Sequence, residues 1–206
     1  MSGRKPPAGQ RQRLAYEAAR IMAEEGAAEF ERARRKAAER LGLSDRRCWP
    51  SNGEIQDALL AHRRLFQGDK QVRELEHLRR QALSAMRRFA AFRPRLVGPA
   101  LTGTGDAAQG VRLFLFASPE EVVFALIDQG IPWEEREVSL RYAGGVRRAH
   151  PVFGFFAGET PFALIVLPLE ARRNPPLDPI SERPDKGADA AEVERLLSIG
   201  EDREAP

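Results

Sequence analysis

The sequence contains few of the residues that build metal centres and covalent catalytic sites. Cys48 is the only cysteine among 206 residues, and the three histidines, His62, His77 and His150, are scattered along the chain. An internal disulfide is therefore excluded, and neither a zinc-ligand spacing nor a Ser-His-Asp or Cys-His pattern is recognisable. We expect Cys48, next to Trp49, to be a packed side chain rather than a nucleophile.

Long apolar segments are also absent. No apolar run approaches the roughly 18 residues that a membrane-spanning helix needs. The first residues, MSGRKPPAGQRQR, are basic but lack the apolar core of a secretory signal. The sequence therefore predicts a cytoplasmic protein with no membrane partner.

Charge is present in quantity and is unevenly distributed. Residues 1–93 hold 21 Lys and Arg against 12 Asp and Glu, whereas residues 94–206 hold 12 against 18. A basic first half favours a nucleic-acid-facing module, or two halves that attract each other. Solvated helix faces rich in arginine would give the same composition.

Periodicity and turn signals predict an α+β fold with four parts. Residues 1–12 are expected to be a disordered basic N-terminus, and residues 13–68 a helical module. Residues 69–170 are expected to form a small mixed α/β sheet domain. Residues 171–206 are expected to form a loose proline-rich arm followed by a short helix.

Individual elements follow from the same patterns. Helices are predicted over residues 13–25, 28–41 and 190–199, and one further helix follows Ser118. A Ser51–Glu54 capping box opens another helix, which Gly68 ends. A long helix capped by Asp69 is predicted over residues 70–92. The predicted strands are 95–101, 111–117, 133–142, 146–156 and 162–167. About four helices thus precede the sheet.

The stretch VGPALTGTGDAAQGVRLFLF, residues 97–116, is the strongest candidate for a binding site. The apolar segment of the first predicted strand ends at Gly98, and Gly103 and Gly105 permit a tight loop with exposed N–H groups, so the loop is a candidate phosphate site. Arg112 on the next strand could hold a phosphate without a metal. A plain connecting turn, and an Arg112 paired with a nearby glutamate, are the alternatives. No Lys-Ser or Lys-Thr follows the glycines, so this is not a P-loop.

The order of these elements resembles the DNA polymerase beta-like nucleotidyltransferase superfamily. That family has a long helix, a strand ending in hydrophobic-Gly-Ser, a loop glycine, and then a strand bearing acid-hydrophobic-acid. Gly98, Pro99 and Gly103 fall on the Gly, the Ser and the loop glycine. The resemblance covers about residues 70–168 and implies an α/β fold and, in active members, Mg²⁺-dependent transfer of a nucleotidyl group.

This chain departs from the family at every catalytic acid. The acid pair falls on Gly110 and Arg112, and the third acid falls on Ala163. Because Mg²⁺ is held by carboxylates and substrate phosphates, the resemblance implies a degenerate member with no catalytic residues and no magnesium cofactor. Asp106 and Glu159 are the acids that could be considered as relocated ligands, although exposed turns commonly carry such residues.

A second candidate site lies on the helix predicted over residues 28–41. Arg32, Arg35, Lys36 and Arg40 recur at a spacing that gathers four cations onto one stripe. Helped by basic residues of the N-terminus, this stripe could follow a phosphate backbone. Among the aromatic residues, we considered Phe153 with Arg147 and Arg148 as a stacking platform for bases.

Three functions follow, and the first is favoured. It is a non-catalytic nucleotidyltransferase-like protein that binds a nucleotide, an RNA or a protein partner in the former cleft. The second is a basic helical nucleic-acid-binding protein with an α/β scaffold, and the third is a regulatory protein-interaction module. An active nucleotidyltransferase comes last.

Overall fold

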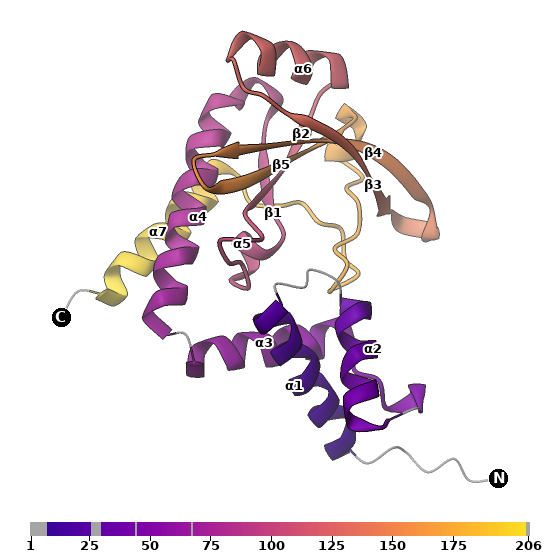
Figure 1. The fold of residues 1–206 in the computed structure, drawn as a ribbon. Helices are drawn as coiled ribbons and strands as arrows, with labels where there is room; N and C mark the ends of the chain where they lie inside the picture. Colours follow the sequence, from indigo (N-terminus) through magenta and orange to yellow (C-terminus); the bar gives the residue numbers. More distant parts are fainter. Residues whose placement is uncertain (1–7, 26–29, 44, 67, 205–206) are drawn as a thin grey trace. The chain divides into compact units, whose positions relative to one another are not determined.

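The computed structural model describes residues 8–25, 30–43, 45–66 and 68–204. It divides into two compact units, residues 1–71 and 72–206. The helices are α1 (Ala8–Glu25), α2 (Phe30–Leu41), α3 (Asn52–Phe66), α4 (Gly68–Arg88), α5 (Pro99–Thr102), α6 (Pro119–Asp128) and α7 (Ala190–Glu204). The strands are β1 (Arg95–Val97), β2 (Val111–Phe116), β3 (Glu134–Arg141), β4 (Arg147–Ala157) and β5 (Thr160–Leu167). Figure 1 shows these elements, and the mixed α/β class is confirmed.

The first unit packs α1, α2 and α3 around a small core. Leu14, Ile21 and Ile55 are fully buried there, together with the alanines of α2. The predicted capping box at the start of α3 is confirmed, because Ser51 and Glu54 exchange side-chain and backbone hydrogen bonds. Cys48 is buried and donates its Sγ–H to Gln10, which agrees with a packed side chain.

Several predicted helix boundaries are wrong. α1 begins at Ala8, so residues 8–12 are helical rather than part of a disordered N-terminus, while residues 1–7 lie outside the described residues. Gly68 is the first residue of α4 and does not end α3, so Asp69 lies inside α4. The same helix ends at Arg88, and a 3₁₀ turn (η2, Ala90–Phe92) replaces its predicted last turn.

The second unit is built on a five-stranded mixed sheet in the order β1-β2-β5-β4-β3. β2 and β5 pair in parallel, and every other neighbouring pair is antiparallel. Because parallel strands need a crossover, the chain passes from β2 through α6 and the β3–β4 hairpin before it returns as β5. Ser118 and Glu121 form the predicted capping box at the start of α6.

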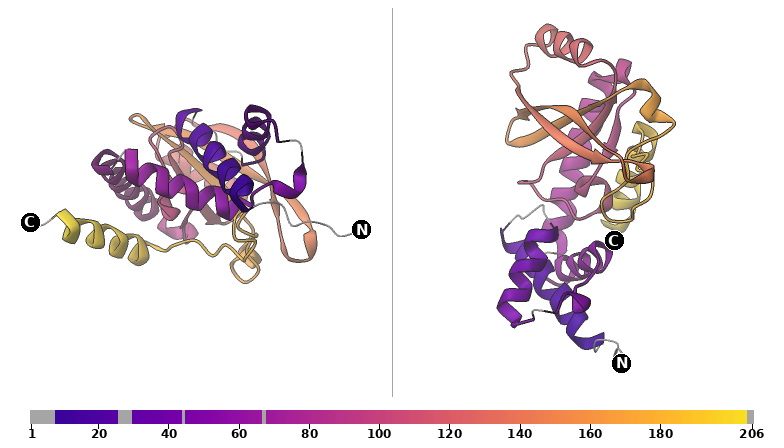
Figure 2. Two further views of the ribbon diagram at one scale, coloured as in Figure 1. Left: turned by 90° about the horizontal axis from the view of Figure 1, so that it is seen from below. Right: turned by 90° about the vertical axis from the view of Figure 1, so that its right-hand side faces the viewer.

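One face of the sheet is covered by helices. Side chains of α4, α6 and α7 share a core with Leu113, Leu115 and Leu164 of the central strands. α4 and α7 lie side by side in Figures 1 and 2, and Arg87 of α4 pairs with Glu194 of α7 at 2.8 Å. We call the opposite face of the sheet, which carries Arg112 and Phe114, the open face.

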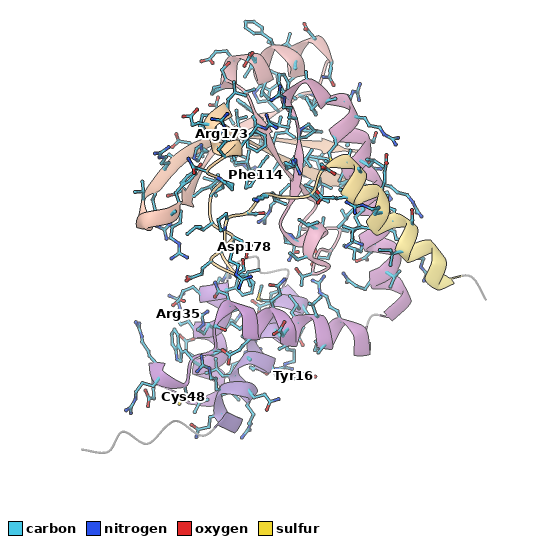
Figure 3. All side chains as sticks on the ribbon, turned by 180° about the vertical axis from the view of Figure 1, so that it is seen from behind. Tyr16, Arg35, Cys48, Phe114, Arg173 and Asp178 are labelled. Atoms are coloured by element: carbon cyan, nitrogen blue, oxygen red, sulfur yellow. The ribbon has the colours of Figure 1, made fainter. Side chains whose placement is uncertain are left out.

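The predicted loose arm is instead held on the sheet. Leu177 N donates to Arg141 O at the end of β3, and Ala188 pairs with Leu96 through two backbone hydrogen bonds of 2.8 Å. The turn η4 (Leu169–Arg172) buries Ala171 against Phe114 and its neighbours on the open face. Figure 3 labels Phe114, and Arg173 and Asp178 on the segment that follows η4.

A buried polar pair lies towards one end of the open face. His150 on β4 is only 5% exposed, and its Nε2 lies 2.8 Å from the Tyr142 hydroxyl. Burial lowers the pKa of His150, whereas a hydrogen bond with the backbone of Val166 acts in the opposite direction and the charge of Arg148 lowers the pKa further. The neutral ring is therefore the stable form in the folded chain.

Gly110 immediately precedes β2 and has no room for a side chain. Its φ is +61°, and a Cβ built there would lie 2.0 Å from the carbonyl oxygen of Pro161, the second residue of β5. Real Cβ atoms do not approach an oxygen so closely. The start of the parallel pairing between β2 and β5 therefore requires glycine at this position.

We predict that Gly110→Ala costs about 3 kcal/mol or more of unfolding free energy, because backbone atoms would have to separate. Gly158→Ala is the matched control: its φ is also +61°, but nothing lies within 4 Å of its Cβ. That variant should cost only the strain of the left-handed conformation, about 1 kcal/mol. Denaturant unfolding measures both, and equal losses would contradict the close contact.

We also predict that acid destabilises the fold through His150. The unfolded chain binds a proton near pH 6.5, whereas the folded chain, with its lowered pKa, does so only at lower pH. The stabilisation that comes from keeping His150 neutral is therefore present in full above about pH 6.5, and it is lost as the pH decreases towards the folded pKa. His150→Gln should have a lower melting temperature but a smaller decrease between about pH 7.5 and about pH 5.5. An unchanged pH dependence in this variant would refute the assignment.

Candidate functional site

The candidate site lies on the open face of the sheet, where strand register aligns a row of residues. Arg112 on β2 is opposite Ala163 on β5, Ala163 is opposite Gly154 on β4, and Gly154 is opposite Glu134 on β3. Directly paired residues point to the same side of a sheet. The row thus carries one long cationic side chain beside two positions that have little or no side chain.

These small residues leave a hollow beside Arg112. A pocket of about 490 Å³ includes all four residues of the row. Its other lining residues come from the ends of the strands and the loop before β3: Gln109, Val111, Pro132, Trp133, Arg136, Val152, Phe155, Phe156, Pro161 and Phe162. Most of these are apolar or aromatic, so the pocket combines one basic wall with apolar ones.

Arg112 is half-buried, and no acidic side chain pairs with it among the residues that the structure describes. Burial lowers the pKa of its guanidinium, and no charged neighbour contributes to that shift. The guanidinium nevertheless stays protonated, because its ordinary pKa lies far above neutrality. An alternative considered from the sequence, a pairing with a nearby glutamate, is therefore wrong for the described part of the chain.

The structure brings Arg112 and Gly98 together. Gly98 has φ +72° and ψ −152°, a conformation that only glycine adopts readily. A Cβ built on it would lie 3.4 Å from Cδ of Arg112, so the arginine side chain lies across this glycine. Gly98 ends β1 at Val97, which is why the strand predicted over residues 95–101 is shorter than expected.

The other two loop glycines, Gly103 and Gly105, have structural roles at the end of α5 and against it. Gly103 ends the four-residue helix α5 in a left-handed conformation. A Cβ on Gly105 would lie 3.0 Å from the backbone nitrogen of Ala100, so Gly105 packs directly against α5. Both therefore have a structural reason to be glycine, whether or not a ligand binds.

Arg79 of α4 fixes this loop, and the sequence analysis missed it. Its guanidinium donates to the carbonyl oxygens of Ala100 and Leu101 at 3.1 and 3.2 Å. Both carbonyls lie in α5, and this four-residue helix is too short to provide backbone N–H donors for them. Burial lowers the pKa of Arg79, while the charge of Glu76 acts in the opposite direction. The only sequence signal was an arginine beside the apolar stripe of α4, which is common on helices.

Two of the three positions expected for catalytic acids are neighbours. Arg112 and Ala163 are paired in register. The third position, Gly110, has no space for a carboxylate because of its contact with Pro161. The arrangement therefore places a cation and a methyl group where carboxylates were sought.

Neither relocated acid lies in a metal-ligand cluster. Asp106 accepts a hydrogen bond from the backbone N–H of Gln109 and stabilises the turn before β2. Glu159 is exposed in the β4–β5 turn. Within residues 8–25, 30–43, 45–66 and 68–204, no group of three or more His, Cys, Asp or Glu side chains could hold a metal ion.

The cationic stripe of α2 is partly neutralised by α1. Lys36 pairs with Glu25 at 2.6 Å, and Arg40 pairs with Glu17 at 3.2 Å. Arg32 and Arg35 remain exposed, and Figure 3 labels Arg35. A role of this stripe in nucleic-acid binding stays a prediction that rests mainly on these two arginines.

Aromatic side chains take different places from those expected. Phe153 is 1% exposed and belongs to the core, so the proposed stacking platform of Phe153 with Arg147 and Arg148 is wrong. Arg148 lies over the ring of Tyr142 instead. Phe156, also on β4, is 71% exposed at the pocket. Alternation along β4 was the signal that could have separated these two phenylalanines.

Comparisons with known proteins identify no relative: no family model, curated protein or solved structure matches this chain. None of the helices in the described part of the chain is long and apolar enough to span a membrane.

We predict that Arg79→Ala lowers the unfolding free energy by about 1–3 kcal/mol, because the carbonyls of Ala100 and Leu101 lose a charged, partly buried donor. Arg73→Ala, an exposed arginine on the same helix, should change it by less than about 0.5 kcal/mol. Hydrogen exchange of residues 98–105 should also accelerate in the first variant only. Equal protection of this loop in both variants would contradict the role of Arg79.

Proposed function

We propose that this protein binds a phosphate-bearing ligand, a nucleotide or an RNA end, on the open face of its sheet, and that it does so without a metal and without nucleotidyl transfer. The observation that carries the proposal is Arg112, a half-buried guanidinium with no acidic partner among the described residues.

A buried charge without a partner is unfavourable, because desolvation is not repaid by attraction to an opposite charge. An arriving phosphate supplies that opposite charge and accepts two parallel hydrogen bonds from one guanidinium. Gly98 allows the Arg112 side chain to lie against the backbone at the end of β1, because a Cβ there would already contact Cδ of Arg112 at 3.4 Å. Binding would thus relieve an unfavourable feature of the unliganded fold.

The absence of catalysis follows from the same residues. Two-metal phosphoryl transfer needs carboxylates that hold divalent cations, and it concentrates positive charge at the reacting phosphate. Arg112 and Ala163 offer no anionic oxygen, and Gly110 has no space for one. The resemblance to nucleotidyltransferases therefore supports a retained phosphate site rather than a retained reaction.

We predict that isothermal titration detects nucleotide binding with the same affinity in the presence and absence of Mg²⁺. Arg112→Met should weaken it about tenfold or more, since charge-assisted hydrogen bonds are lost. Gly98→Val should also weaken it, because a β-branched residue does not adopt this backbone conformation. Arg147→Met is the matched control: it removes an exposed cation of β4 that is not a lining residue of the pocket, and it should leave the affinity unchanged.

Two outcomes would overturn the proposal. One is the absence of heat and of thermal stabilisation with every nucleoside phosphate and with short RNA. The other is binding that requires Mg²⁺, which would mean that metal ligands have been overlooked. Far-ultraviolet circular dichroism and melting curves should establish that each variant is folded before its binding is compared.

A further inference from the structure

From the pocket on the open sheet face we infer that the ligand is a nucleoside monophosphate group, either free or at the end of an RNA, and not a nucleoside triphosphate. This inference rests on the proposed function and narrows its ligand class. Two independent features of the pocket support the inference: the number of unpaired charges in its lining, and the apolar and aromatic residues that make up the rest of the lining.

The pocket contains one cation that is available to a ligand. Its charged lining residues are Arg112, Glu134 and Arg136. Glu134 and Arg136 neutralise each other through an exposed ion pair. Within the described residues, this leaves the single charge of Arg112.

One guanidinium matches one phosphate group. A phosphate monoester carries about −1.5 to −2 charges near neutral pH, and its oxygens match the planar fork of one arginine. A triphosphate carries further negative charge, which proteins usually neutralise with Mg²⁺ and additional lysines or arginines. Among the described lining residues, the only second cation, Arg136, is already paired with Glu134, so a second and a third phosphate would remain uncompensated.

The remaining walls suit a planar, weakly polar group. Trp133 is half-buried in the lining and Phe156 exposes 71% of its surface there, whereas Phe155 and Phe162 belong to the helix-covered core and are 9% and 4% exposed. Phe156 and Gly154 share the open face, because they are two residues apart on β4. An exposed phenylalanine offers a ring face on which any nucleobase can stack. The ligand therefore combines one phosphate with one base.

The test is a titration series on the full chain with adenosine, inorganic phosphate, AMP, ADP and ATP, each without metal, and with ATP plus Mg²⁺. We expect AMP to bind at least as tightly as ADP and ATP, and about tenfold or more tighter than adenosine or inorganic phosphate. A short RNA with a 5′-phosphate, compared with its 5′-hydroxyl form, distinguishes an RNA end from a free mononucleotide.

Variants separate the two halves of the site. Phe156→Ser should lower the affinity for AMP about five- to a hundredfold through lost stacking, and should leave the affinity for inorganic phosphate unchanged. Arg112→Met should weaken both. Phe124→Ser is the matched control, since Phe124 is 65% exposed on α6 and is not a lining residue. It should change neither affinity.

The outcomes distinguish this inference from the proposed function. ATP that binds more tightly than AMP without metal would overturn the monophosphate inference and leave phosphate binding at Arg112 intact. The same holds if Phe156→Ser binds AMP as the unchanged protein does. Failure of every ligand, including both RNAs, would overturn both proposals.

Discussion

The parallel pairing of β2 with β5 is the constraint on which the second unit depends. These strands come from segments about fifty residues apart, and six register pairs join them. Their pairing begins at the contact of Gly110 with Pro161, where backbone approaches backbone without an intervening side chain. The helix α6 and the β3–β4 hairpin are both placed by this crossover, because they form the connection between the two paired strands.

The same pairing separates a structural face from an open face. Alternate residues of β2 point to opposite sides, so Leu113 and Leu115 enter the helix-covered core while Arg112 and Phe114 face the other way. At Phe114 the open face is closed by η4 and Ala171. At Arg112 the row continues with Ala163 on β5 and Gly154 on β4, and these small residues line the pocket. The packing of η4 on Phe114 covers one part of the open face, and the small residues beside Arg112 leave a pocket in the other part, so the proposed ligand would lie beside Arg112.

Local signals in the sequence predicted much of the fold. The capping boxes at Ser51 and Ser118 are properties of a few adjacent residues, and both form as expected. The strand over residues 111–117 was correct to within one residue because a continuous apolar run is typical of a buried strand. One boundary was wrong at Gly98, where the unusual backbone conformation of this glycine ends β1 before the predicted residue 101.

The candidate site was predicted only in part, for a similar physical reason. Gly98 and Arg112 were selected from one short stretch, and they do lie together. The small residues that make the hollow come from β5 and β4, and only strand register places Ala163 and Gly154 beside that arginine. The hydrogen bonds from Arg79 to α5 join residues about twenty apart in the sequence, and no local sequence pattern predicts them. Sequence periodicity identifies faces of elements, whereas pairing partners depend on the whole chain.

The close packing of Gly110 also limits which sequences this scaffold can reach. Arg112 and Ala163 are open to exchange for aspartate one position at a time, since each has space on the open face. Gly110 is different, because any side chain there must first separate two central strands. An acid at position 110 would therefore need further changes around Pro161. In evolutionary terms, positions 112 and 163 can vary independently, whereas position 110 can vary only together with its neighbour on β5.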